Sequence, residues 1–172
     1  TNVAITTETP SRLADRFPGF FDAVLVDAPC SGEGMFRKSL AARQAWTPAL
    51  VEGCALRQQG ILEHAAVLVR PGGRLVYSTC TFAPEEDEAV LDALLRQYPR
   101  HFVIESVERL LPTSAPGVVR DGDLAFHPDV SKAVRLWPHL YDTSGFFAAL
   151  IRKQGATTGE GAAPPERSRD RA

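Results

Sequence analysis

The sequence has 172 residues, of which 44% are hydrophobic and 23% charged, proportions that are ordinary for one globular domain. No apolar run approaches the ~18 residues of a membrane span, and no secretion signal opens the chain, so we expect a cytoplasmic protein. The net charge of −2 excludes a basic field over the whole molecule. A nucleic-acid-binding role would therefore depend on a local basic patch or on further segments.

The chain begins at Thr1 rather than Met, within an expected strand over residues 2–6. We interpret it as a fragment of a longer polypeptide, although proteolytic maturation would give the same start. Three cysteines without CxxC spacing, and four histidines without metal-ligand spacing, predict neither a disulfide framework nor a metal site.

Residues 22–27 are almost wholly apolar and predict a short strand of a parallel sheet that is covered on both faces. Turn-forming residues follow at 28–34. Thr47 and Pro48 form the N-cap and first-turn pattern of a helix start. Apolar residues then recur at 3- and 4-residue steps, with Gln58 as the one polar interruption, which predicts a long helix.

Residues 71–73, Pro-Gly-Gly, predict the end of this helix, and residues 74–78 predict a second strand. Pro84 predicts the start of another helix. Its first turn would hold four carboxylates at 85–88, where the helix dipole favours negative charge. The alternation of strands and helices predicts an α/β fold with a parallel sheet.

Residues 134–137 and 145–151 predict two more strands, which we expect to form an antiparallel hairpin that closes one edge of the sheet. From residue 154 the composition shifts to Gly, Ala, Thr, Pro, Glu and Arg. We therefore expect one folded unit over 1–153 and a disordered tail over 154–172.

Two of the three cysteines follow the predicted strands directly. Ligands bind beyond the carboxyl ends of strands in open α/β sheets, and neighbouring strands lie about 5 Å apart. We therefore expect Cys30 and Cys80 to face one crevice, with Asp27 at its floor. Both cysteines could instead be small buried hydrophobes, as Cys54 on the apolar helix face is expected to be. Asp27 could simply cap the loop that follows it.

The segment 21–32, Phe-Asp-Ala-Val-Leu-Val-Asp-Ala-Pro-Cys-Ser-Gly, resembles the signature of the Sun/Fmu-type family of RNA cytosine-5 methyltransferases. Residues 78–81, Ser-Thr-Cys-Thr, resemble the second motif of that family. They are followed by its Pro-Glu-Glu-x-Glu pattern at 84–88, where Asp87 stands in place of the commoner Asn. Arg135, Pro138-His139 and Gly145-Phe146-Phe147 resemble the motif that closes the catalytic domain.

This resemblance implies the C-terminal part of a Rossmann-like fold that uses S-adenosylmethionine as methyl donor and RNA as substrate. Residues 33–38 are similar to the bacterial branch that modifies 16S ribosomal RNA, so the small-subunit RNA is the expected partner. The Gly-rich donor-binding loop of the family should precede this segment and is absent from the sequence. We therefore expect weak donor binding and low activity from this chain alone.

By resemblance, Cys80 attacks carbon 6 of cytosine, Cys30 assists breakdown of the covalent adduct, and Asp27 contacts the base close to the donor. Thr9, or its neighbour Glu8, would serve on the adenine side of the donor. Four basic side chains are candidates for phosphate contacts, each of which could equally be solvated surface or structural: Arg37, Lys38, Arg135 and His139.

Three other functions compete with this hypothesis. A DNA cytosine-5 methyltransferase would use Cys30 of the Pro-Cys pair as nucleophile, but the Glu-Asn-Val motif of those enzymes is lacking. A non-catalytic RNA-binding remnant would keep the fold without donor binding. A cysteine hydrolase would need a histidine paired with the thiol, and no histidine lies in a motif that suggests one.

Overall fold

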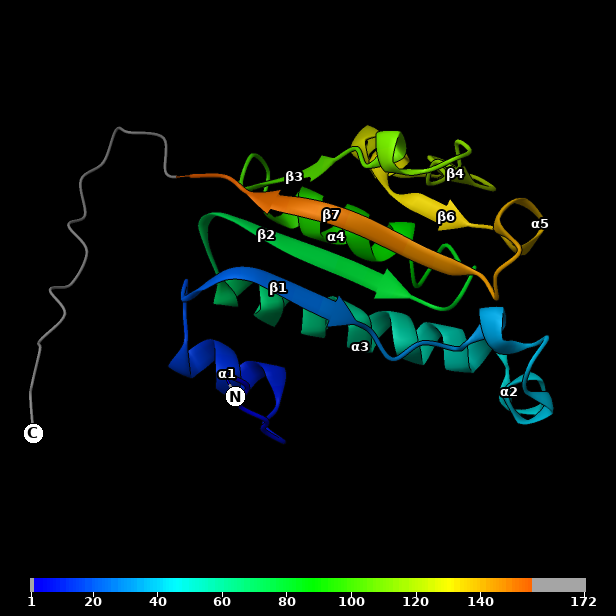
Figure 1. Ribbon diagram of the computed structural model, residues 1–172, viewed down its shortest axis with the longest axis horizontal. Helices are drawn as coiled ribbons and strands as arrows, with labels where there is room; N and C mark the ends of the chain where they lie inside the picture. Colours follow the sequence, from blue (N-terminus) through cyan, green and yellow to red (C-terminus); the bar gives the residue numbers. More distant parts are fainter. Residues whose placement is uncertain (1, 156–172) are drawn as a thin grey trace, which may run out of the picture.

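The computed structural model describes residues 2–155, which build a mixed sheet with two long helices on one face (Figure 1). Within these residues the strands follow the order β1-β2-β7-β3, and β6 pairs with β7 beside this path. β1 and β2 are parallel, whereas β7 is antiparallel to β2, β3 and β6. β7 therefore runs antiparallel to its three partner strands, β2, β3 and β6.

The bounds of the elements are as follows. The strands are β1 (Phe21–Asp27), β2 (Val69–Thr79), β3 (Phe102–Glu105), β4 (Arg120–Asp121), β5 (Leu124–Ala125), β6 (Val134–Leu136) and β7 (Phe146–Lys153). The α-helices are α1 (Pro10–Arg16), α2 (Leu40–Ala45), α3 (Pro48–Leu68), α4 (Glu88–Gln97) and α5 (Pro138–Tyr141). Three 3₁₀ turns, η1 (Glu33–Met35), η2 (Glu108–Leu110) and η3 (Pro128–Lys132), complete the connections.

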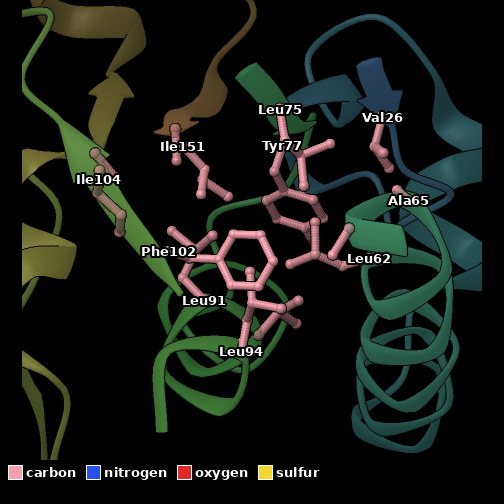
Figure 2. Close-up of a cluster of buried hydrophobic side chains, with 14 of the residues drawn as sticks. Val26, Leu62, Ala65, Leu75, Tyr77, Leu91, Leu94, Phe102, Ile104 and Ile151 are labelled. Carbon is pink, nitrogen blue, oxygen red and sulfur yellow. The ribbon is translucent and has the colours of Figure 1, made fainter. Parts of the chain in front are cut away.

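The core lies between the sheet and helices α3 and α4 (Figure 2). Leu62 of α3 and Leu91 of α4 point toward Leu75 and Tyr77 of β2, and all four are at most 1% exposed. Burying such a side chain contributes about 1.5–3 kcal/mol each. This packing fixes the carboxyl ends of β1 and β2 relative to each other, and the predicted α/β fold class is confirmed.

Three predicted boundaries are wrong. Residues 2–6 form no strand, because no neighbouring strand among residues 2–155 pairs with their backbone groups. Helix α3 begins at Pro48, with the Thr47 hydroxyl accepting a hydrogen bond from the Leu50 amide, but it ends at Leu68. Pro71-Gly72-Gly73 lies inside β2, where it produces a shift in the register with β1.

The predicted hairpin is half right. β6 and β7 are antiparallel neighbours, but β7 lies inside the sheet between β2 and β3 rather than at its edge. β1 is an edge strand, and its Leu25 is 69% exposed, so the expected cover on both faces is absent among the described residues. The tail predicted at 154–172 falls almost entirely outside the described residues. No helix within residues 2–155 has the length and apolarity to cross a membrane.

Candidate active site

The two cysteines that follow β1 and β2 lie side by side. Cys30 and Cys80 place their Sγ atoms 3.3 Å apart, and both side chains are partly exposed. The parallel register of the strands brings this about, because Asp27 of β1 pairs with Ser78 of β2. The prediction that both sulfurs share one rim of the sheet is therefore confirmed. Cys54, on α3, is also a partly exposed free thiol.

The pKa values of the two thiols are shifted in opposite directions. The Cys30 hydrogen bond lowers the pKa of Cys80 to about 7, although burial and the nearby charge of Asp27 oppose that shift. The same hydrogen bond, together with burial, raises the pKa of Cys30. Proton sharing therefore favours a Cys80 thiolate that accepts from the Cys30 thiol. A free thiol has a pKa of about 8.5, so Cys80 is the more nucleophilic at neutral pH.

The loops around the cysteines are held by backbone contacts that leave little space. The Gly34 amide donates to the Cys80 carbonyl at 2.8 Å. A Cβ atom at Gly34 would lie 2.9 Å from that oxygen and 2.8 Å from the carbonyl of Gly145. The Ser31 and Thr81 hydroxyls are 3.0 Å apart and tie the two loops together again. Gly34 is therefore required for this close approach rather than for a turn alone.

The acidic residues at 85–88 were predicted to form the first turn of a helix, and the structure differs. Helix α4 begins at Glu88, not at Pro84, and the side chains of Glu86, Asp87 and Glu88 are 0% exposed. Of these three residues only Glu88 lies in the first turn of α4, and all three carboxylates have partners inside the protein rather than in solvent. Glu88 pairs with Arg135, Asp87 accepts from the Thr79 hydroxyl, and Glu86 accepts from the Ser31 amide.

Asp27 stands at the exposed end of β1 and accepts a hydrogen bond from the Ser78 hydroxyl at 3.3 Å. It also lines a largely apolar groove of about 330 Å³, together with Pro10 and Leu13 of α1. Thr9 is exposed beside Pro10, where its hydroxyl caps α1 by accepting from the Arg12 amide. Asp27 and Pro10, the neighbour of Thr9, therefore line the same groove.

This groove fits part of a methyl donor. An apolar wall suits an adenine ring, and a carboxylate at its end suits the ammonium group of an amino acid. The donor set is incomplete, because no Gly-rich turn lines the groove within residues 2–155. Among the described residues no cluster of His, Cys, Asp and Glu side chains could hold a metal ion.

Arg135 is not a surface residue, so the prediction that it contacts RNA phosphate is wrong. Its side chain is 1% exposed and forms a double hydrogen bond with the Glu88 carboxylate. It also donates to the Phe82 carbonyl at 3.0 Å, two residues after Cys80. Arg135 thus holds the loop that follows Cys80 to β6 from inside the protein.

The other three basic candidates lie at the surface. Arg37 and Lys38 are exposed and line a hollow of about 360 Å³ with residues 142–144. His139 is exposed on α5. η1, α2 and α5 all lie at the end of the sheet toward which β1 and β2 run, the end that carries the cysteines (Figure 1).

Solved structures share this arrangement, and one of them is described as a methyltransferase homolog. The chain superposes with TM-score 0.70 on a methyltransferase homolog protein from Pyrococcus horikoshii, at 29% identity over 89% of this chain and 45% of that chain. It superposes with TM-score 0.69 on NSun6 from Pyrococcus horikoshii with SFG, at 28% identity over 88% of this chain and 35% of that one. The fold is therefore that of a methyltransferase catalytic domain.

The sequence match is more specific. A family model described as "16S rRNA methyltransferase RsmB/F" matches residues 1–152, and the chain belongs to this family. It is 37% identical to ribosomal RNA small subunit methyltransferase F of Aeromonas salmonicida, over 89% of this chain. The identity to the protein of the same name from Erwinia tasmaniensis is 38% over 88% of this chain. The chain spans about 30% of the length of these relatives.

Two residues of the site were missed. Gln58 was noted as a polar interruption of an apolar helix face, and its side chain is completely buried beneath the Cys30 loop, where it donates to the Pro29 carbonyl. Glu86 was assigned to helix-start electrostatics. The polar residue at an apolar position was the signal in the sequence, but only the structure identifies its partners.

Proposed function

We propose that the whole protein to which this chain belongs transfers a methyl group to carbon 5 of a cytosine in small-subunit ribosomal RNA. The observation that carries this proposal is the 3.3 Å approach of the Cys30 and Cys80 sulfurs, with Cys80 the more acidic. The family membership of residues 1–152 supports the RNA substrate and the methyl donor S-adenosylmethionine. The free thiols fit a reducing, cytoplasmic location.

The chemistry needs a nucleophile that can also leave. Carbon 5 of cytosine is unreactive until a thiolate adds to carbon 6, which makes the ring an enamine. We assign this addition to Cys80, whose thiolate forms near neutral pH. Bound S-adenosylmethionine would supply the methyl group. A base then takes the carbon-5 proton, the electrons of that bond restore the carbon 5–carbon 6 double bond, and the Cys80–carbon 6 bond breaks to free the thiolate.

The other residues have supporting roles in this proposal. Cys30 holds a proton beside the Cys80 sulfur, so it can stabilise the thiolate as it forms and as it leaves. Asp27, exposed at the end of β1, would hold the ring nitrogen or amino edge of cytosine close to the donor. A paired cytosine would have to leave its stack before Cys80 could reach it.

Arg37, Lys38 and His139 would position the RNA by contacting its phosphates. Their exposure at the cysteine end of the sheet supports this role. Phosphate contacts fix orientation without reading the sequence. Because the whole chain carries a net charge of −2, a local site of this kind is what an RNA substrate would require.

Donor binding would need a further part of the whole protein. Within residues 2–155 β1 is an edge strand, with Leu25 69% and the preceding Phe20 61% exposed. An unpaired edge flanked by apolar side chains favours the addition of another strand. We propose that the family's Gly-rich donor-binding segment lies there, opposite Asp27 and near Thr9. Calorimetry should then show donor binding by the whole protein and very weak binding by residues 1–172 alone.

The test of the function is methyl transfer by the whole protein to small-subunit ribosomal RNA, with the product nucleoside located by mass spectrometry. We expect 5-methylcytidine in RNA and no methylation of DNA of the same sequence. Methylation of DNA instead would favour the Pro-Cys alternative with Cys30 as nucleophile. RNA binding without methylation would favour the non-catalytic alternative.

A further inference from the structure

Beneath the two cysteines lies a carboxylate whose interactions join the loop after β1 to the loop after β2. The Glu86 side chain is 0% exposed. One carboxylate oxygen accepts from the Ser31 amide at 2.9 Å and from the Gln58 amide nitrogen at 2.8 Å. The second oxygen lies 3.3 Å from the same Ser31 nitrogen. Glu86 belongs to the loop of Cys80, and Ser31 directly follows Cys30.

Gln58 completes this connection from α3. Its side-chain nitrogen donates both to Glu86 and, at 2.9 Å, to the Pro29 carbonyl. Cys30 is therefore bracketed by two residues, Pro29 and Ser31, whose backbone polar groups both connect to one buried carboxylate. The backbone of Glu86 is fixed as well, because its carbonyl accepts from the Tyr77 hydroxyl at 2.6 Å.

Burying a carboxylate costs several kcal/mol unless it is paired. Arg135, the buried cation nearby, pairs with Glu88 and lies 3.6 Å from Asp87. The hydrogen-bond donors of Glu86 are instead an amide nitrogen of the backbone and an amide side chain, both supplied by the neighbourhood of Cys30. The Ser31 amide reaches Glu86 only while the Cys30 loop stays against it, whereas Gln58 donates from α3.

We propose that Glu86 is a positioning residue, whose carboxylate holds the Cys30 loop against the Cys80 loop so that the two sulfurs can share a proton. Gln58 extends this hold to Pro29. The role deepens the proposed function, since a Cys80 thiolate is the nucleophile in that mechanism. Glu86 itself need not touch the RNA or the donor.

The experiment is a pH series of iodoacetamide alkylation of the full chain, with the rate at Cys80 followed by peptide mass spectrometry. In the unmodified chain the midpoint should lie at about 7. Glu86→Met is close in length to glutamate but removes the carboxylate oxygen that accepts from both Ser31 and Gln58. We expect the midpoint to rise toward the ~8.5 of a free thiol, and Cys80 to react roughly fivefold more slowly at neutral pH.

The direction in which the alkylation midpoint moves distinguishes a positioning role of Glu86 from a simple effect of its charge. The negative charge of Glu86 raises the pKa of Cys80, so loss of that charge alone would lower the midpoint. A higher midpoint would therefore show that the Cys30 thiol has moved away and no longer donates to Cys80. The matched control is Glu85→Met, since Glu85 is exposed and adjacent, and it should leave the midpoint unchanged.

A folded Glu86→Met chain with the midpoint unchanged or lowered would overturn the proposal. If that variant does not fold, Gln58→Met removes the donor to both Glu86 and Pro29, and it should raise the midpoint by a smaller amount. A folded Gln58→Met chain with an unchanged midpoint would overturn the proposal equally. Alkylation needs neither RNA nor methyl donor, so these outcomes are independent of whether the whole protein methylates RNA.

Discussion

Arg135 and Glu88 form an ion pair in which both side chains are at most 1% exposed, and the pair joins β6 to the start of α4. Removing one member of a buried pair leaves the other charge without compensation. We therefore expect Arg135→Met to lower the free energy of unfolding by about 3–5 kcal/mol in urea denaturation. The double variant Arg135→Met/Glu88→Leu should recover much of that loss. If Arg135→Met were as stable as the parent, the pair would have no structural role.

Asp87 makes the free energy of unfolding depend on pH with the opposite sign to that expected for a carboxylate in a surface ion pair. Burial raises the pKa of Asp87, although the Thr79 hydrogen bond and the Arg135 charge oppose it. The folded state then holds this proton more tightly than the unfolded chain, whose Asp pKa is about 3.9. The contribution of Asp87 to stability is complete below that value and declines as pH rises through the folded pKa.

Asp87→Asn should remove this decline. The amide keeps the acceptor for Thr79 and carries no charge into the core, so the free energy of unfolding at pH 7 should rise by on the order of 1 kcal/mol. Urea denaturation across a pH series measures it. The control is Asp22→Asn, because Asp22 is exposed in its pair with Arg70 and should change stability by less than about 1 kcal/mol. A loss of stability at high pH in Asp87→Asn would contradict this assignment.

Arg37 and Lys38 should affect RNA binding and not folding. Each phosphate contact that is lost should reduce the slope of log affinity against log salt by roughly 0.7 for single-stranded RNA. We expect Arg37→Ala and Lys38→Ala in the whole protein to weaken binding to all RNA sequences alike, with unchanged unfolding transitions. Exposed Arg100, before β3 at the opposite end of the sheet, supplies the control variant. If all three substitutions reduced RNA affinity equally, the prediction of a phosphate-binding site at Arg37 and Lys38 would be wrong.

Hydrogen peroxide should join Cys30 and Cys80 in a disulfide. The Cys80 thiolate attacks one peroxide oxygen, releases hydroxide and becomes a sulfenic acid. The Cys30 sulfur, 3.3 Å away, then attacks the Cys80 sulfur, and water leaves with the Cys30 proton. Mass spectrometry should find these two peptides linked, with the loss of two hydrogens and reversal by dithiothreitol. Cys30→Ser should stop at the sulfenic acid, and linkage of Cys80 to Cys54 instead would contradict the geometry.

The cysteine pair could be predicted from the sequence because it depends on two short segments, each a strand followed directly by its cysteine. A strand followed by Pro29-Cys30 and a strand followed by Thr79-Cys80 need only a parallel register to bring the sulfurs together, and the register of Asp27 with Ser78 does so. The start of α3 was equally local, since Thr47 and Pro48 specify it without tertiary contacts.

What could not be predicted depends on burial by distant segments. Arg135 and the carboxylates at 86–88 are charged residues of the kind that usually lie at the surface, and only the packing of β6 against the loop after Cys80 encloses them. The position of β7 inside the sheet likewise depends on its pairing with both β2 and β3, which no local pattern contains.

The central claim is that Cys80, rather than Cys30, bonds to cytosine. The direct measurement is the covalent protein–RNA adduct of the whole protein with small-subunit RNA, resolved by denaturing electrophoresis, with Cys54→Ala as control. We predict no adduct from Cys80→Ala, because the thiolate is gone, and an accumulated adduct from Cys30→Ala, because breakdown slows. An adduct that persists in Cys80→Ala and disappears in Cys30→Ala would contradict the account.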